Sequence, residues 1–274
     1  MTRLYYEVVK DIPSYLDELD GAYLAATGHD LLGLAARTTG TSRDEAAQKI
    51  RNFTAAVVPV TSGKGVIPGF SLAVESILNH IGLTAFVTGQ PDIAGIGEAF
   101  QREAQILFSA DDQKFLAFNL HSRKVVDNSQ ATASGFTQAM AAAAEKDSGG
   151  LAGARVLVIG LGPVGSYAAL ELKKIGALVS VFDIDLLKIK RFVDANDGMQ
   201  AVYDLRLAAG EINYIYDATP APKIIDDEMI RPSTVISCPG VPHGLTAAAL
   251  VKAGPGFMHD VLPLGVAAMA LQCI

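Results

Sequence analysis

The pattern of apolar and polar positions differs between the first 50 residues and the rest of the chain. Residues 1–50 carry apolar positions at helical spacing, and TSRDEAAQKI opens with a Thr/Ser helix cap followed by acidic residues. From Ala55 onward, short apolar runs alternate with helical stretches. The expected strands lie at 55–60, 83–88, 105–110 and 115–120, and the expected helices lie at about 71–81, 92–102 and 129–146. Polar residues follow the first three strands, at the edge where parallel sheets bind ligands.

A second series of strands and helices begins after the small polar segment Asp147–Gly150. A strand is expected at 154–159 and a helix at 164–175, and further strands are expected at about 177–182, 212–216 and 234–238. Residues 256–274 combine a last strand with an apolar helix, which could pack back on the first half of the chain. The polar segment therefore predicts a boundary between two domains, 1–150 and 151–274.

Composition narrows the class of protein. Half of the 274 residues are hydrophobic and 19% are charged, which is typical of a compact globular chain. The net charge of −7 argues against binding to nucleic acid or to an anionic membrane. Neither Cys238 nor Cys273 belongs to a CxxC pair, so we expect no disulfide framework and no metal site. No run of 18 apolar residues and no signal-peptide core occurs, so we expect a cytoplasmic protein.

The most informative motif is VLVIGLGPVG, a GxGxxG pattern between an expected strand and an expected helix. Gly160 would permit the tight turn, Gly162 would let the backbone approach a diphosphate, and Gly165 would allow close packing of the helix on the strand. Pro163 suits the first helical turn, where its missing N–H would be unpaired anyway. A diphosphate would then lie at the helix N-terminus, where free N–H groups favour negative charge.

An acidic residue follows at the position that the same motif requires. Asp183 ends the next strand, where a carboxylate accepts hydrogen bonds from the adenosine ribose. Its charge would repel a 2′-phosphate, which favours NAD over NADP; S-adenosylmethionine is a weaker alternative. We expect Lys188, Lys190 and Arg191 to face solvent on a helix. The pattern predicts an α/β protein in which a C-terminal Rossmann domain follows a smaller N-terminal α/β substrate-binding domain.

Two further turns belong to the same edge of the predicted sheet. They are Asp217-Ala218-Thr219-Pro220 and Ser237-Cys238-Pro239-Gly240, which in such folds flank the ribose and the nicotinamide. The expected cofactor contacts are Gly160, Leu161, Gly162, Pro163, Val164, Gly165, Asp183, Ala218, Thr219, Pro220, Cys238, Pro239 and Gly240. In the alternative interpretation, the two prolines merely end strands. Cys238 has no neighbouring base, which favours a small buried hydrophobe over a nucleophile.

Polar residues at the strand ends of the first domain are candidates for substrate binding. Thr61, Ser62 and Gly63 lie between a strand and a helix, where a carboxylate could bind. The segment around Lys64 lacks the glycine spacing and the following Ser/Thr of a phosphate-binding loop. Asp111 ends another strand and could pair with an ammonium group. From the pattern alone, however, a solvated hairpin turn at 111–114 is the better interpretation.

At these residues the chain resembles the dehydrogenase family that completes pyrrolysine biosynthesis. The similarity runs from about Val57 to the C-terminus, through the strings VPVTSGKG, PGF, ADDxxFLAxNL, VLVIGLGPVG, DATP, SxPGVP and PLGV. The resemblance implies NAD-dependent oxidation of the terminal amine of L-lysine-Nε-3-methyl-D-ornithine to an imine. The substrate's own α-amine then attacks, ammonia leaves and the pyrroline ring closes.

The resemblance also implies site residues. Ser62 and Asn128 would orient polar ends of the substrate, Phe70 would pack on its chain, and Asp111 would hold an ammonium group as the candidate catalytic residue. The family has a glutamate directly before PLG, where this chain has Leu262. That substitution leaves the substrate-side acid open, with His259 and Asp260 as nearby alternatives.

Two other functions stay open from the residues themselves. One is an NAD-dependent dehydrogenase of another amino acid or a hydroxy acid, and the other is a dinucleotide-sensing module without catalysis. Residues 1–50 are compatible with either a lid or a homodimer contact. In every case the expected partner is a small molecule.

Overall fold

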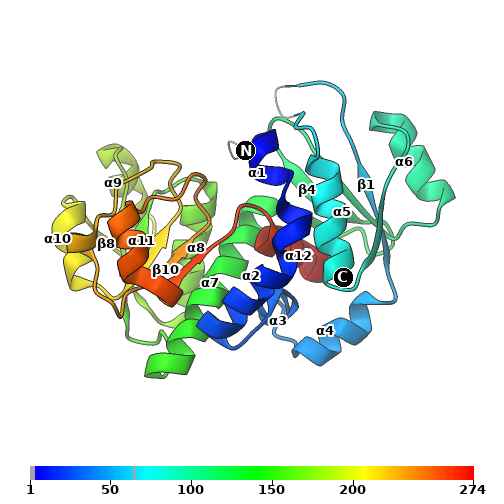
Figure 1. Ribbon diagram of the computed structural model, residues 1–274. Helices are drawn as coiled ribbons and strands as arrows, with labels where there is room; N and C mark the ends of the chain where they lie inside the picture. The colour runs from blue at the N-terminus through cyan, green and yellow to red at the C-terminus, as the bar shows by residue number, and fades with distance from the viewer. Residues whose placement is uncertain (1–3, 64–65) are drawn as a thin grey trace. The chain divides into compact units, whose positions relative to one another are not determined.

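The computed structural model describes residues 4–63 and 66–274, and its contacts divide the chain into two compact units (Figure 1). The first unit comprises Met1–Gly21, Asp30–Gly135 and Val261–Ile274. The second unit comprises Ala22–His29 and Phe136–Asp260. Both units are α/β, as the alternation of apolar runs and helical stretches predicts.

The first unit is built on a mixed five-stranded sheet with the order β2-β1-β3-β4-β5. Its strands are β1 (Thr54–Val58), β2 (Thr84–Val87), β3 (Ile106–Ala110), β4 (Phe115–Asn119) and β5 (Val125–Asp127). β1 pairs in parallel with β2 and β3, whereas β4 pairs antiparallel with β3 and β5. The first four strands confirm the sequence prediction. The three-residue β5 is too short to carry a period of its own, and the sequence analysis missed it.

The helices of the N-terminal half match the expected helical stretches. They are α1 (Tyr6–Val9), α2 (Ile12–Thr27), α3 (Leu31–Arg37), α4 (Arg43–Ile50), α5 (Phe70–His80), α6 (Asp92–Gln101) and α7 (Asn128–Ser148). Ser42 and Glu45 form a capping box at the start of α4, as the string TSRDE indicates. Within this part of the chain, side chains therefore set the ends of helices as well as their buried faces.

The last helix, α12 (Pro263–Cys273), belongs to the first unit. It is buried almost throughout and packs against α3, α5, β4 and β5. The side-chain amide of Asn119 donates to the carbonyl oxygen of Cys273 at 2.9 Å, which ties the end of α12 to β4. A helix that is apolar on every side is expected to be surrounded by protein, and this one is.

The second unit contains a six-stranded parallel sheet with the order β11-β10-β9-β6-β7-β8. Its strands are β6 (Arg155–Ile159), β7 (Leu178–Phe182), β8 (Gln200–Ala201), β9 (Tyr214–Asp217), β10 (Val235–Cys238) and β11 (Phe257–His259). Its helices are α8 (Pro163–Ile175), α9 (Leu186–Asp194), α10 (Leu205–Glu211) and α11 (Ala247–Ala253), with short 3₁₀ turns at Asp227–Met229 and Gly254–Gly256. The strand order reverses at β6, and α/β sheets bind ligands beside such a reversal.

The two compact units divide inside helices α2 and α7. We expected the division at Asp147–Gly150, but the contacts separate Gly135 from Phe136. Gly135 lies against Leu264 of α12 in the first unit, whereas the carbonyl of Phe136 accepts a hydrogen bond from Ser237 in the second. A division inside a continuous helix has no turn or loop beside it, so the sequence pattern gives no sign of it.

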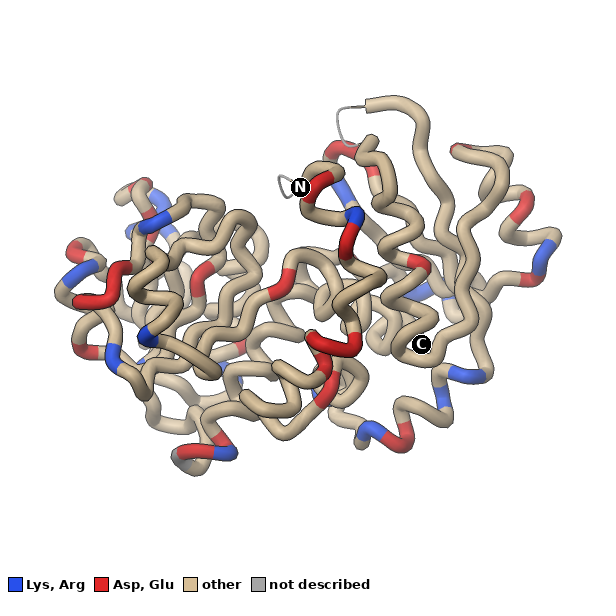
Figure 2. The backbone as a smooth tube through the Cα atoms, in the orientation of Figure 1, with Lys and Arg blue, Asp and Glu red and all other residues tan. Residues whose placement is uncertain are grey.

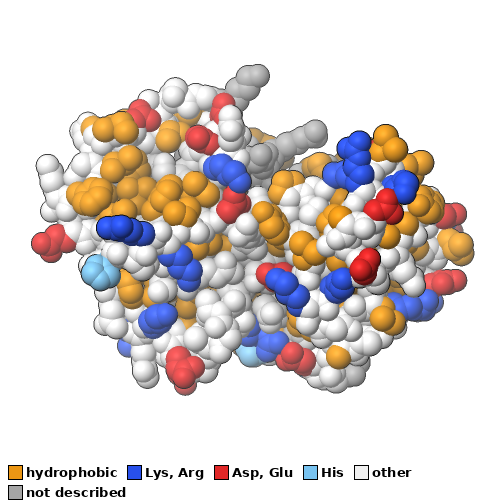
Figure 3. Space-filling model, turned by 180° about the vertical axis from the view of Figure 1, so that it is seen from behind, with side chains coloured by type: hydrophobic (Ala, Val, Ile, Leu, Met, Phe, Trp, Pro, Cys, Tyr) orange, Lys and Arg blue, Asp and Glu red, His pale blue; other side chains and the backbone are white. Residues whose placement is uncertain are grey.

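Charged side chains of both signs are interspersed along the chain (Figure 2), and the face seen in Figure 3 likewise carries acidic and basic side chains side by side. None of the helices in the described residues combines the length and apolar character that a membrane crossing requires.

Replacing Gly265 tests the packing of α12. A Cβ atom there would lie 2.4 Å from Oγ1 of Thr132, so we expect Gly265→Ala to lower the free energy of unfolding by about 1–3 kcal/mol. Gly97 of α6 provides a control, because its Cβ position is open. Gly97→Ala should raise the free energy of unfolding by about 0.5–1 kcal/mol, since alanine favours the helix. Urea denaturation measures both, and equal effects of the two variants would contradict the packing described here.

Candidate active site

The glycine-rich loop joins β6 to α8. Gly160 has a φ of +89°, which favours glycine, and a Cβ atom there would lie 2.7 Å from Cγ2 of Thr219. A Cβ atom at Gly165 would lie only 1.9 Å from the carbonyl oxygen of Gly160. At Gly162, by contrast, no atom of the described residues lies within 4 Å of the Cβ position, its own chain neighbours apart. The loop therefore packs tightly at its two ends and leaves open space at its centre, where a diphosphate would approach.

Asp183 follows β7, and its carboxylate reaches back to the glycine-rich loop. Oδ2 accepts hydrogen bonds from the backbone N–H of Leu161 at 2.8 Å and from Nζ of Lys188 at 3.0 Å, and Oδ1 accepts from the N–H of Asp185 at 3.0 Å. Burial acts to raise the pKa of Asp183, but these hydrogen bonds outweigh it and hold the pKa below its usual value. The residue is thus a carboxylate at neutral pH, and it stands where a ribose-binding acid is expected.

The structure corrects the expectation that Lys188 simply faces solvent. Its ammonium group forms an ion pair with Asp183, although its side chain is 42% exposed. Lys190 pairs instead with Asp194, one turn along the same helix, with both side chains largely exposed. The sequence spacing alone did not separate these two lysines, because the bend after β7 decides which of them reaches Asp183.

Asp217, at the end of β9, joins the loop after β9 to the loop after β10. Its side chain is fully buried. Oδ1 accepts from the N–H and the hydroxyl of Thr219 at 3.1 and 2.8 Å, and Oδ2 accepts from the N–H of Gly244 at 2.9 Å. Burial raises the pKa of Asp217. From the sequence this aspartate was expected only as a turn residue, although an acid directly after an apolar strand was a signal for its buried role.

The same two loops hold the remaining expected cofactor contacts. Ala218 and Pro220 flank Thr219, while Pro239 follows β10. A Cβ atom at Gly240 would lie 2.1 Å from the carbonyl oxygen of Thr219, so the loops touch through their backbones. Each of these positions lies at the carboxyl edge of the parallel sheet, although their contact with a cofactor stays a prediction.

Cys238 is fully buried, and burial together with the neighbouring Asp217 raises the pKa of its thiol well above the usual value. A thiol in this state is a poor nucleophile. The geometry therefore favours the interpretation of Cys238 as a small packing residue.

A histidine lies at the end of β11, next to the end of β10. Nδ1 of His259 is 2.7 Å from the carbonyl oxygen of Cys238. Because a carbonyl oxygen can only accept, Nδ1 carries the proton. Burial lowers the pKa of His259, and the nearby His243 acts in the same direction. The adjoining Asp260 accepts a hydrogen bond from the hydroxyl of Tyr23 at 2.6 Å. His259 and Asp260 are the nearby alternatives for the substrate-side acid, and of these His259 is held as a neutral imidazole.

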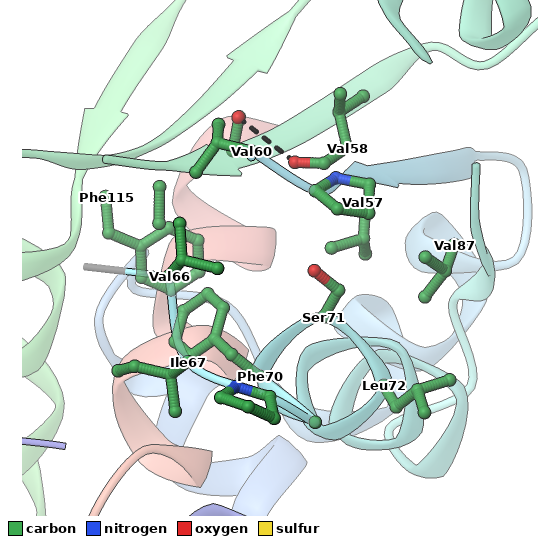
Figure 4. Close-up of a pocket in the computed structure, with 15 residues that line it drawn as sticks. Val57, Val58, Val60, Val66, Ile67, Phe70, Ser71, Leu72, Val87 and Phe115 are labelled. Carbon is green, nitrogen blue, oxygen red and sulfur yellow. Dashed lines mark hydrogen bonds between the residues drawn. The ribbon is translucent and has the colours of Figure 1, made fainter. Parts of the chain in front are cut away.

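The first unit contains an apolar pocket of about 290 Å³ at the carboxyl end of β1 (Figure 4). Its lining comprises Val57, Val58, Pro59, Val60, Val66, Ile67, Pro68, Gly69, Phe70, Ser71, Leu72, Val87, Ser109, Ala110 and Phe115. Phe70 and Phe115 meet edge to face, with ring centroids 5.2 Å apart. The lining includes Phe70 among the expected substrate contacts, whereas Ser62, Asp111 and Asn128 lie outside it. The pocket can accept the hydrocarbon part of a small molecule.

Asp111 lies in the hairpin turn between β3 and β4. Its Oδ1 accepts hydrogen bonds from the N–H groups of Gln113 and Lys114, both at 2.7 Å. These hydrogen bonds, of which the one from Lys114 has the larger effect, hold the pKa of the exposed carboxyl below its usual value. A Cβ atom at Gly63 would lie 2.7 Å from Oδ1 of Asp112 in the same turn. The turn and the exposed segment containing Ser62 are therefore neighbours, as the predicted edge of the sheet requires.

Asn128 is the first residue of α7 and contacts α12. Its Nδ2 lies 3.2 Å from Sδ of Met269 and close to the Cβ position of Gly265. Leu262, which stands where the family resemblance implies a glutamate, is buried directly before α12. Lys64 falls outside the described residues. Within residues 4–63 and 66–274, no group of three His, Cys, Asp or Glu side chains could hold a metal ion.

The chain is similar to known proteins over nearly its full length. Residues 9–126 match the family described as pyrrolysine biosynthesis protein PylD, N-terminal domain, and residues 125–186 match the glutamate/leucine/phenylalanine/valine dehydrogenase family. The chain is 30% identical to pyrrolysine synthase of Methanosarcina acetivorans over 98% of both chains. The chain belongs to the pyrrolysine synthase family. The enzyme of that name from Methanosarcina barkeri is also 30% identical, over 94% of this chain and 93% of its own.

Solved structures show the same fold. Quinate dehydrogenase from Corynebacterium glutamicum, in complex with NAD, matches with a TM-score of 0.51 at 12% identity, over 80% of this chain and 93% of that chain. A shikimate dehydrogenase in complex with NADP⁺ matches with a TM-score of 0.52 at 13% identity, over 80% of this chain and 88% of its own. This member of the pyrrolysine synthase family therefore has a dinucleotide-binding dehydrogenase fold.

A substitution at Gly162 is expected to weaken cofactor binding without lowering the stability of the fold. Gly162→Ala places a methyl group in space that the protein leaves empty, so the free energy of unfolding should stay within about 0.5 kcal/mol of the wild type. The affinity for NADH should fall by about tenfold or more, because the methyl group would meet the diphosphate. Calorimetric titration and urea denaturation measure the two effects. Unchanged NADH affinity in a folded variant would place the diphosphate elsewhere.

Proposed function

We propose that this protein is an NAD-dependent pyrrolysine synthase. In this reaction the terminal amine of L-lysine-Nε-3-methyl-D-ornithine is oxidised to an imine, and ring closure with loss of ammonia gives pyrrolysine. The observation that carries the proposal is the match to pyrrolysine synthase of Methanosarcina acetivorans over 98% of the chain. The open backbone at Gly162 and the carboxylate of Asp183 supply the features that such a dehydrogenase needs for its cofactor.

The second unit would bind NAD through its own backbone and one carboxylate. The N-terminus of α8 and the loop around Gly162 would receive the diphosphate, and Asp183 would accept hydrogen bonds from the adenosine ribose. Bound NAD would supply the hydride acceptor. The loops joined by Asp217 would define the position of the nicotinamide, because a hydrogen bond and a close backbone contact hold them together.

The first unit would bind and orient the substrate. The pocket beside Phe70 and Phe115 would accept the hydrocarbon part of the substrate. Asp111 is held as a carboxylate, which can pair with a substrate ammonium group. Ser62 and Asn128 would orient polar ends. Hydride loss from the carbon requires the neutral amine, so one proton must leave the ammonium group before oxidation.

Turnover of the proposed substrate tests this function. Purified protein mixed with L-lysine-Nε-3-methyl-D-ornithine and NAD should form NADH, with release of ammonia and of pyrrolysine detected by mass spectrometry. The Gly162→Ala variant serves as a folded control with weakened cofactor binding. Faster oxidation of a different amine or of an alcohol would indicate another dehydrogenase, and dinucleotide binding without turnover of any amine would indicate a sensing module.

The role of Asp111 can be tested without breaking its hairpin. In Asp111→Asn the side-chain amide oxygen can still accept hydrogen bonds from the N–H groups of Gln113 and Lys114. Loss of the negative charge should raise KM for the substrate about fivefold, which is the change in affinity expected when an exposed ion pair is lost. KM for NAD should stay constant. Asp112→Asn, in the same turn, is the matched control. If both variants keep the wild-type KM, Asp111 does not hold the ammonium group.

A further inference from the structure

Lys188 forms an ion pair with the acidic residue of the dinucleotide motif. Its Nζ atom lies 3.0 Å from Oδ2 of Asp183, whose side chain is only 10% exposed. Asp185 caps α9 by accepting hydrogen bonds from the N–H groups of Leu187 and Lys188, which fixes the backbone of Lys188 in the first turn of that helix. The ammonium group therefore lies beside the carboxylate that an adenosine ribose would contact.

The ion pair leaves Asp183 able to bind a ribose. A carboxylate offers about four acceptor positions. Those of Asp183 receive hydrogen bonds from Leu161, Lys188 and Asp185. A ribose hydroxyl can join these donors, and it can also accept a hydrogen bond from the ammonium group of Lys188. The pair is therefore compatible with NAD.

A 2′-phosphate would meet a different electrostatic environment from the one that Asp183 alone would create. A bare carboxylate repels the phosphate of NADP, whereas a cation 3.0 Å from that carboxylate offsets its charge and can pair with the phosphate directly. In dinucleotide-binding domains that take NADP, a nearby arginine accommodates the 2′-phosphate. Lys188 has the charge and the position for this task.

Lys190 shows that the pair at Lys188 is not an ordinary feature of the helix surface. Nζ of Lys190 lies 2.7 Å from Oδ2 of Asp194, and the two side chains are 68% and 61% exposed. An exposed pair at this spacing contributes little to stability. The partner of Lys188, in contrast, is nearly buried and touches the glycine-rich loop through Leu161.

We infer that Lys188 determines cofactor specificity by admitting NADP at a site whose acid favours NAD, an inference that rests on the dinucleotide binding proposed above. The wild-type protein binds both dinucleotides, and NAD is bound more tightly. Removal of the ammonium group leaves Asp183 uncompensated, so the affinity for NADP falls much more than the affinity for NAD.

Titrations of NADH and NADPH into the wild type and into Lys188→Met test this inference. Methionine keeps most of the aliphatic stem and removes the charge. The dissociation constant for NADPH should rise at least about tenfold, while that for NADH changes by less than about threefold. Lys188→Arg should retain NADPH binding. Lys190→Met is the matched control, and it should leave both constants unchanged.

Asp183→Asn gives a second measurement on the same pair. Because the carboxylate is replaced by a neutral amide, Lys188 can pair with a phosphate, and the binding preference should shift from NADH toward NADPH. Equal loss of both dinucleotides in Lys188→Met, or no NADPH binding by the wild type, would overturn the inference and leave the proposed NAD-dependent function intact. If the wild type binds neither dinucleotide, the proposed function and the inference both fail.

Discussion

The close approach of helix α8 to the loop at the end of strand β6 is the constraint on which the dinucleotide site depends. A single methyl group at Gly165 would lie 1.9 Å from the carbonyl oxygen of Gly160, and one at Gly160 would strike Thr219. Because both ends of the loop are packed to contact, its centre at Gly162 is held open in one place. The free N–H groups of α8 are thereby aimed at a defined volume, which is the condition for binding a diphosphate.

Buried hydrogen bonds hold the neighbouring loops in place as well. Asp217 lies beneath the loops after β9 and β10 and accepts hydrogen bonds from Thr219 and Gly244. A buried carboxyl group is stable only when its acceptors are used, so the fold cannot release one loop without leaving a polar group unpaired. His259 adds a further link through the carbonyl of Cys238. These bonds hold the carboxyl edge of the sheet in a defined arrangement, and a rigid site lowers the cost of binding.

The substrate-binding side follows a different physical principle. The pocket of the first unit is lined mainly by aliphatic residues and two phenylalanines, with Ser71 and Ser109 among them, and the polar candidates for substrate binding lie at the surrounding strand ends and turns. Such a division suits a substrate with a hydrocarbon chain and charged ends, because apolar walls supply affinity and a few polar groups fix orientation. Asp111 contributes a charge that is fixed in place by the hairpin in which it lies.

The order of apolar and polar residues was sufficient to predict most strands and helices, because each carries the period of its own secondary structure. The glycines at 160, 162 and 165 and the acid at 183 could also be predicted as a dinucleotide-binding motif, since their spacing follows from one local turn and one strand. The short strands β5 and β8 were missed, since two or three residues cannot show a period. Ser62, Phe70, Asp111 and Asn128 came from resemblance to a family, and the pattern alone favoured a plain turn at Asp111.

Tertiary structure decided the features that join residues far apart in the sequence. It brought α12 into the first unit, divided the compact units inside α7 and placed the carboxylate of Asp217 beneath two separate loops. It also selected Lys188 rather than Lys190 as the partner of Asp183. Local sequence fixes the period and the ends of an element, whereas the partner of a side chain depends on where packing brings the rest of the chain.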